Sequence, residues 1–313
     1  MRTRAALAAA VATGAGLALY SAAATRRAER LVPRDGQLID VDGHALHVVE
    51  QGSGPAIVMV HGLGGQARNF DYGVATTLAA RHRVVLIDRP GSGYSPALDG
   101  DDIGIGAQAR LVARLIELLE IDRPLLVGHS YGGAVSLALA LTQPGLIRGL
   151  ALIAPLSQRL PPLPPMVGPL TRLPLTARML TASIVGTPIG LLTQRRMLEA
   201  AFAPEPVAPD FAVRGGGALS RRPGAIAAAA GDLRTADAEL STMTPLYPSI
   251  DLPTAILFGR SDQVLDPSLH GERTAASIPN ARWQSVSGGH MLPVTQPETT
   301  VRFIEDAYRS SSG

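Results

Sequence analysis

Four short apolar runs, separated by helical stretches, constrain the fold of this chain more than any other feature. The runs are AIVMVHG, RVVLIDRPG, PLLVGHS and GLALIAP, and they occupy Ala56–Gly62, Arg83–Gly91, Pro124–Ser130 and Gly149–Pro155. They are rich in β-branched residues without polar alternation, which is typical of strands buried on both faces. The segments between them have helical periodicity, most clearly AQARLVARLIELLEI. This alternation predicts an α/β fold with a mostly parallel sheet covered by helices.

The pattern divides the chain into four parts. Residues 1–30 form an apolar N-terminal segment, and residues 31–155 hold the four runs, preceded by two strands that turn at Asp42-Gly43. Residues 156–248 begin rich in proline and continue rich in Ala, Leu and Gly, without clear strands. The strand pattern resumes with TAILFG in residues 249–313. We expect one core in two parts, with residues 156–248 inserted as a helical cap. A disordered loop is the alternative, which the Leu, Met and Ile content of this segment opposes.

The uncharged run of residues 5–24 lies between arginines and has a length of about one bilayer span. It predicts an uncleaved transmembrane anchor of undetermined orientation, which would make the protein membrane-associated. A signal peptide cleaved after Ala22-Ala23-Ala24 is one alternative and would give a secreted or periplasmic protein, although Arg26 and Arg27 oppose translocation. A surface helix is the other, because the run is mostly alanine and its strongly apolar residues are few: Leu7, Val11, Leu17 and Leu19.

Composition excludes several chemistries. The chain has no cysteine and no lysine, so disulfides, thiolate nucleophiles, Schiff bases and phosphate-loop lysines are absent. The net charge is +2, of which the first thirty residues carry +4 (five Arg against Glu29), so the remainder carries −2. No basic face for nucleic acid follows from this balance. The chain also lacks the motif His-Glu-x-x-His, and we expect no metal and no cofactor.

A serine caged by glycines joins the third run to the next helix. Ser130 lies in Gly128-His129-Ser130-Tyr131-Gly132, directly between a predicted buried strand and a helix. This is the position of a nucleophile elbow, where a strained turn exposes the serine hydroxyl over the carboxyl edge of the sheet. The flanking glycines leave room for so tight a turn. Because a serine is a poor nucleophile alone, the chain must also supply a base.

One of the seven histidines follows the last predicted strand at the carboxyl edge of the sheet. This is His290, in SVSGGHMLP. The remaining six lie on an early strand, before a strand, at the start of a loop, within the elbow facing away from the serine, or in a helix: His44, His47, His61, His82, His129 and His270. His290 is therefore the predicted general base.

The acid should follow a strand between the serine and the histidine. Asp262 comes three residues after the terminal glycine of TAILFG and is the predicted acid. Asp266, before Pro267, is expected to cap the next helix instead. Asp88 precedes the serine, which does not fit the order Ser…Asp…His, and we expect it to stabilise the turn in DRPGSGYS. The predicted catalytic residues are Ser130, Asp262 and His290.

A glycine-rich turn after the first run predicts an anion site. In VMVHGLGGQ the backbone amides can face the elbow, and the natural donors are the N–H groups of Leu63 and Tyr131, one from each loop. These would form an oxyanion hole, in which each donor is typically worth about 10²–10³ in rate. The contacts are made by the main chain, so the Leu63 and Tyr131 side chains are not required; the Tyr131 ring either lines the pocket or packs.

Together these motifs resemble the α/β-hydrolase fold superfamily, in its serine-nucleophile branch. The resemblance runs from about Gly36 to the C-terminus and rests on HGLGG, DRPGSGYS, GHSYGGA, GRSDQVLDP and GGHMLPVTQPE. It implies the α/β-hydrolase fold with an inserted helical cap. The matching branch contains bacterial esterases, cofactor-free haloperoxidases and C–C bond hydrolases. Haloalkane dehalogenases and epoxide hydrolases of this fold carry aspartate at the elbow, where this chain has Ser130, and the cap matches no family pattern.

The residues and the resemblance predict a carboxylesterase-like serine hydrolase that cleaves a small to medium apolar ester through an acyl-enzyme. The apolar character of the substrate is inferred from the Leu, Met and Pro residues of the cap. A C–C bond hydrolase or a haloperoxidase-like perhydrolase with the same triad is the alternative. A binding protein that kept the fold and lost catalysis is a different class, which the intact serine, acid and histidine oppose. The sequence leaves the substrate and the oligomeric state open.

Overall fold

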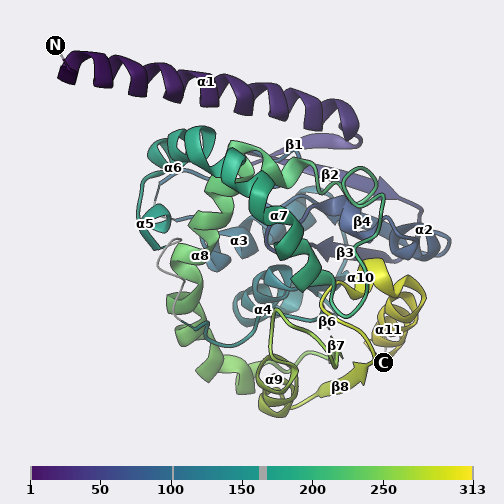
Figure 1. Cartoon of the computed structure of the whole chain (residues 1–313). Coiled ribbons are helices and arrows are strands. Elements are labelled where there is room, and N and C mark those ends of the chain that lie inside the picture. Colours follow the sequence, from purple (N-terminus) through teal and green to yellow (C-terminus); the bar gives the residue numbers. More distant parts are fainter. Residues whose placement is uncertain (1, 101, 162–167, 312–313) are drawn as a thin grey trace.

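The computed structural model describes residues 2–100, 102–161 and 168–311 and is built around one eight-stranded sheet (Figure 1). The strand order is β1-β2-β4-β3-β5-β6-β7-β8. The strands β1 and β2 are antiparallel to their neighbours, and all other pairs are parallel, which confirms the mostly parallel sheet predicted above. Their bounds are β1 Gln37–Val41, β2 His44–Gln51, β3 Ala56–Val60, β4 Arg83–Ile87, β5 Leu125–His129, β6 Gly149–Ile153, β7 Thr254–Gly259 and β8 Ala281–Val286.

Helices cover both faces of the sheet. Successive side chains of a strand point to opposite faces, so each buried strand feeds two apolar layers. On β3, Val58 and Val60 belong to the layer beneath α3 and α4, whereas Ile57 and Met59 belong to the layer beneath α2 and α11. The α-helices are α1 Arg2–Leu31, α2 Val74–Ala79, α3 Ile105–Leu118, α4 Tyr131–Thr142, α5 Gly168–Thr171, α6 Leu175–Thr181, α7 Thr187–Phe202, α8 Pro223–Met243, α9 Arg273–Ser277, α10 Leu292–Thr295 and α11 Pro297–Ser310.

In its described residues, the segment between β6 and β7 contains helices joined by turns and no strand. It contributes α5 to α8, of which α8 packs on α3 and α4 and so joins this segment to the sheet layers. Figure 1 shows these helices, in teal and green, lying together beside the sheet. The limits given to the cap, residues 156–248, remain a prediction.

The N-terminal helix α1 corrects one prediction. It runs through Arg2–Leu31 and projects beyond the body of the molecule (Figure 1). Among the helices in the described ranges, none combines the length and the apolar character that crossing a bilayer requires. The predicted transmembrane anchor at residues 5–24, and the membrane association and localisation based on it, are therefore wrong. The physical reason is composition: an alanine-dominated run gains too little from transfer into lipid, whatever its length.

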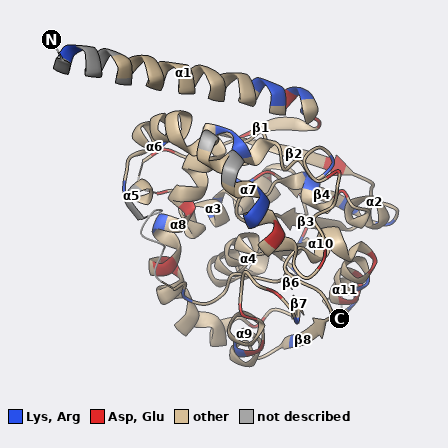
Figure 2. Ribbon diagram, viewed as in Figure 1, with Lys and Arg blue, Asp and Glu red and all other residues tan. Residues whose placement is uncertain are grey.

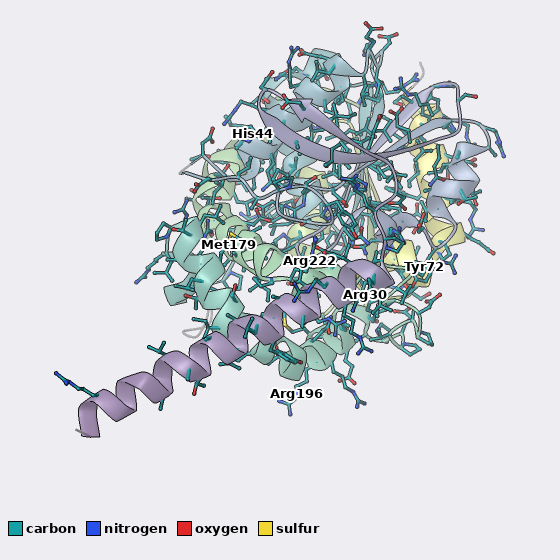
Figure 3. The ribbon with its side chains drawn as sticks, turned by 90° about the horizontal axis from the view of Figure 1, so that it is seen from above. Arg30, His44, Tyr72, Met179, Arg196 and Arg222 are labelled. Atoms are coloured by element: carbon teal, nitrogen blue, oxygen red, sulfur yellow. The ribbon has the colours of Figure 1, made fainter. Side chains whose placement is uncertain are left out.

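The C-terminal half of α1 contacts the body instead. Ala28 and Val32 are buried against Ala218 and Leu219, which lie between α7 and α8. The Ser21 hydroxyl donates to the Ser183 carbonyl at 2.6 Å. Figure 3 shows Arg222 beside this helix, where its guanidinium lies 3.1 Å from the Glu29 carboxylate. Figure 2 shows arginines toward both ends of α1, with an uncharged stretch between them.

Candidate active site

Ser130 occupies a strained turn at the carboxyl edge of the sheet. It is the single residue between β5 and α4, with φ 53° and ψ −119°, a conformation that is costly for a residue with a side chain. The turn is tied on both sides, because Ser130 N–H donates to the Ile153 carbonyl (3.0 Å) and Leu156 N–H donates to the Ser130 carbonyl (2.9 Å). A β-carbon at Gly132 would lie 2.2 Å from the Val60 carbonyl oxygen, so glycine is required there. The structure therefore places Ser130 on a tight strand-to-helix turn, and its role as nucleophile stays a prediction.

Asp262 and His290 form a hydrogen-bonded pair. Asp262 follows β7 and His290 follows β8, and the Asp262 Oδ2 lies 2.7 Å from the His290 Nδ1. The other carboxylate oxygen accepts from the N–H groups of Val264 (2.8 Å) and Leu265 (3.0 Å), which fixes the orientation of the side chain. Both side chains are nearly inaccessible to solvent. This arrangement leaves Nε2 as the ring nitrogen of His290 available for proton transfer.

The elbow and the His290 loop are held together by the neighbouring residue His129. Its Nε2 lies 3.0 Å from the His290 carbonyl oxygen, and the two rings are 5.0 Å apart between centroids. Burial lowers the pKa of His129 to about 3, so the ring is neutral and Nε2–H is the donor to that carbonyl. Within the described residues no hydrogen bond joins Ser130 Oγ to His290. Such bonds are often long in unliganded enzymes and shorten in the Michaelis complex.

The loop after β3 lies directly against the Ser130 side chain. A β-carbon at Gly62 would lie 2.8 Å from the Ser130 Cβ and 3.3 Å from its Oγ, so the Gly62–Leu63 peptide adjoins the hydroxyl. Over the described part of the chain, neither Leu63 N–H nor Tyr131 N–H donates a hydrogen bond to another protein group. The Leu63 side chain is 37% exposed, whereas the Tyr131 ring is buried. The Tyr131 ring packs against the Arg89 guanidinium. Of the two roles predicted for this ring, lining the pocket or packing, the structure shows packing.

The other buried histidines have structural partners. His61 Nε2 accepts from Arg89 N–H at 2.9 Å, and His270 Nδ1 accepts from the N–H groups of Ser157 and Gln158, each at 3.2 Å. Burial lowers the pKa of His61 to about 3 and that of His270 to about 4, which keeps both rings neutral. His47 Nδ1 lies 2.7 Å from the Asp88 carboxylate. Each of these rings is therefore held by neighbouring groups of the protein.

Asp88 and Asp266 have the structural roles predicted from the sequence. Asp88 accepts from the N–H groups of Ala67 and Tyr94, each at 2.8 Å, and so closes the turn that follows β4. Asp266 caps the helix that begins at Pro267 by accepting from Ser268 N–H at 2.9 Å. Among the described residues there is no cluster of three or more His, Asp or Glu side chains placed to hold a metal ion.

Sequence reasoning missed two side chains that join the segment between β6 and β7 to the site. The Glu205 carboxylate accepts from Gly289 N–H at 3.1 Å, next to His290. Asp232, on α8, pairs with the buried Arg89 at 2.9 Å. Arg89 lies in the quoted motif DRPGSGYS, where its burial could have been suspected. Asp232 and Glu205 lie in a segment with no assignable motif, and only the three-dimensional structure brings them to the site.

Comparisons with known proteins place the chain among relatives of one fold. A family model described as alpha/beta hydrolase fold matches residues 55–297. An uncharacterised protein of Mycobacterium tuberculosis is 29% identical over 271 residues, which cover 81% of this chain and 74% of that protein. A thermophilic esterase from Thermogutta terrifontis superposes with a TM-score of 0.69 and 24% identity over 88% of this chain and 97% of that one. The enol-lactonase from Burkholderia xenovorans LB400 has a TM-score of 0.71 and 21% identity over 87% and 100% of the two chains. Because the esterase and the enol-lactonase are less than 25% identical to the chain, they show a shared fold only.

Proposed function

The chain belongs to the alpha/beta hydrolase fold family, and from this premise we propose that it is a serine hydrolase of small to medium, largely apolar carboxylic esters. The observation that carries the proposal is the 2.7 Å contact between Asp262 Oδ2 and His290 Nδ1 in a loop held against the strained Ser130 turn. A nucleophile on a strained turn and a histidine oriented by a carboxylate are the parts that acyl transfer needs. The esterase and lactonase folds that superpose on the chain are compatible with this reaction.

In the proposed reaction Ser130 Oγ attacks the acyl carbon while His290 Nε2 takes the hydroxyl proton. The Asp262 carboxylate stabilises the resulting imidazolium and keeps the ring oriented. The N–H groups of Leu63 and Tyr131 would stabilise the tetrahedral oxyanion. Collapse of this intermediate breaks the ester C–O bond, and His290 returns the proton to the leaving alcohol. Water then attacks the acyl-enzyme by the same route and releases the acid, so ester and water give acid and alcohol.

A buried apolar cluster beside His290 supports an apolar substrate. Phe202 and Phe211, from the segment between β6 and β7, pack with Met291 and Val294, which follow the histidine. The two phenylalanine rings meet edge to face at 4.9 Å between centroids. We propose that this cluster borders the acyl or alcohol group of the substrate, because a polar group placed there would lose its hydrogen bonds to water.

Reaction with a fluorophosphonate probe and turnover of p-nitrophenyl esters test the proposal. The wild-type protein is expected to label and to hydrolyse the esters, and Ser130→Ala should abolish labelling and lower kcat by roughly 10⁶-fold, as loss of the nucleophile does in serine proteases. Ser241→Ala, which removes a half-buried hydroxyl on α8 that donates to the Ala238 carbonyl, is the matched control and should retain both. Full activity in Ser130→Ala, or turnover of a vinylogous diketone without ester turnover, would refute the ester hydrolase proposal.

A further inference from the structure

Arg89 is a buried cation in direct contact with the loop that carries one of the proposed oxyanion donors. It follows β4 at the carboxyl edge of the sheet and is only 1% exposed. Its Nε donates to the His61 carbonyl and its Nη2 to the Gly62 carbonyl, each at 3.0 Å. The guanidinium therefore holds two consecutive carbonyl groups of this loop. A planar, permanently charged fork suits such a two-point contact better than any other side chain.

The Gly62 carbonyl and the Leu63 N–H belong to the same peptide group. In a trans peptide these two groups point in opposite directions, so a donor that fixes the carbonyl oxygen also fixes the direction of the N–H. Gly62 itself lies against Ser130, since a β-carbon there would approach the Ser130 Oγ to 3.3 Å. A cation on the carbonyl oxygen also polarises the peptide and strengthens its N–H as a donor. Arg89 can thus orient the Leu63 N–H by binding the carbonyl on the opposite side of the same peptide group.

We propose that Arg89 is a positioning residue for the oxyanion hole, which orients and polarises the Gly62–Leu63 peptide, and that Asp232 on α8 holds Arg89 in place. This inference deepens the proposed function and rests on it. Arg89 Nη1 donates to the Asp232 carboxylate at 2.9 Å and to Gln108 Oε1 at 2.8 Å. Gln108 in turn donates to the other Asp232 oxygen at 2.8 Å. The carboxylate that balances the buried charge comes from the segment between β6 and β7, so the position of α8 controls the oxyanion site.

The second proposed donor contacts the same guanidinium. The Arg89 Cζ lies 4.5 Å from the centre of the Tyr131 ring, and the Tyr131 N–H is the donor on the elbow side. Arg89 therefore contacts the peptide group of one proposed donor, through the Gly62 carbonyl, and the ring of the other, Tyr131. His61 supports this arrangement, because its neutral Nε2 accepts from Arg89 N–H.

Steady-state kinetics of Arg89→Met measure this role. Loss of one oxyanion donor costs about 10²–10³ in kcat, and we expect a loss of about 10²-fold with KM changed by less than about threefold. The matched control is Arg83→Met, at the opposite end of β4, where the arginine also binds a carboxylate, Glu50, and a carbonyl, Leu119. Arg83 lies far from the elbow along the strand, so this control should keep the wild-type kcat. A folded Arg89→Met with kcat within threefold of wild type would overturn the inference.

A spectroscopic measurement separates positioning from a general structural role. The carbonyl stretch of a carbon-13-labelled acyl-enzyme, trapped with a slowly hydrolysed ester, reports polarisation by the oxyanion hole. Arg89→Met should move the stretch to higher frequency, toward that of a free ester, whereas Arg83→Met should not. A fall in kcat without this shift would overturn the inference. If Arg89→Met does not fold, the double variant Arg89→Met/Asp232→Leu removes both buried charges together and should show the same two effects.

Fluorophosphonate labelling of the wild-type protein distinguishes failure of this inference from failure of the proposed function. If the wild type neither labels nor turns over esters, the serine hydrolase proposal fails and takes the role of Arg89 with it. If the wild type labels and the folded Arg89 variant labels at the same rate with the same acyl carbonyl stretch, the role of Arg89 alone is refuted.

Discussion

The contacts within the sheet core differ from the contacts that join the segment between β6 and β7 to it. In the core, the strands β3 to β6 have no exposed residue, and an apolar layer lies on each face of the sheet. The inserted segment also packs apolar side chains against the core, among them Leu240 and Met243 of α8, but it adds carboxylates that accept hydrogen bonds from the core. Asp232 binds Arg89, Glu205 binds Gly289 N–H, and Glu239 accepts from Ile105 N–H (3.1 Å) and Gly106 N–H (2.7 Å) at the start of α3.

This difference separates stability from positioning. Apolar burial is non-directional and tolerates many sequences, so it builds the sheet without fixing where a neighbouring segment sits. A carboxylate that accepts two hydrogen bonds from a helix start or a guanidinium is directional and fixes that position. Core substitutions should therefore act on the free energy of unfolding, and substitutions at the carboxylates should act on the geometry of the site.

The largest effect on stability is expected from truncation in the core. Leu126→Ala removes a fully buried side chain of β5 and should lower the free energy of unfolding by about 2–5 kcal/mol, because it removes apolar burial and leaves a cavity. The matched control is Leu180→Ala in the inserted segment, where the side chain is 62% exposed and the change should stay within about 0.5 kcal/mol. Urea denaturation measures both. Equal losses in the two variants would contradict the contrast between the regions.

All seven histidines lie outside residues 156–248. Acid should therefore lower the free energy of unfolding through histidines of the core and not of the inserted segment. Burial lowers the pKa of His61 and His129 to about 3 and that of His270 to about 4, from 6.5. Between these values and 6.5 the unfolded chain binds more protons than the folded one, so the free energy of unfolding falls as pH falls below about 6.5. Burial opposes the shift of His47, but the hydrogen bonds and charges of Asp88 and Asp35 together raise its pKa. Its contribution to stability acts in the opposite direction, since it is lost only as pH rises through that pKa.

Urea denaturation at pH 7 and pH 5 measures this dependence. His270→Asn keeps an acceptor for the Ser157 and Gln158 N–H groups and removes one titrating ring. It should therefore make the loss of stability between the two pH values smaller than in the wild type. If the free energy of unfolding falls by the same amount in both proteins, burial does not lower the pKa of His270.

The sequence predicted the part of the molecule that depends on local pattern. Continuous apolar runs such as Ala56–Gly62 identify buried strands, because a strand covered on both faces has no polar positions. The hydrogen bond between Asp262 and His290 was also predictable, since both residues follow strands whose carboxyl ends meet at one edge. Arg89 was not assigned a role, because its partner Asp232 lies 143 residues away in a segment without a recognisable pattern. The membrane prediction is wrong because a run of bilayer length without charges is still too weakly apolar when most of it is alanine.

The last expected effect is an increase in the free energy of unfolding, caused by a substitution in the inserted segment. Arg178, on α6, is 1% exposed, and within the described residues its Nε and Nη1 have no hydrogen-bond partner. Burial lowers the pKa of this guanidinium, the charge of Arg234 adds to the effect, and the charges of Asp232 and Asp99 oppose it. Only glycine at position 231 leaves room for it, since a β-carbon there would lie 2.2 Å from the Arg178 Nη1. The side chain is thus a buried charge that the segment tolerates at a cost.

Arg178→Met should raise the free energy of unfolding by about 1–3 kcal/mol, the usual cost of leaving buried donors unpaired. Methionine keeps the length of the side chain and removes its charge, and Asp232 keeps Arg89 as its partner. Arg196→Met, on the exposed face of α7 (Figure 3), is the control and should change stability by less than about 0.5 kcal/mol. If Arg178→Met were instead less stable than the wild type, the guanidinium would have to be stabilised where it lies. The inserted segment would then be fixed by buried cations as well as by carboxylates.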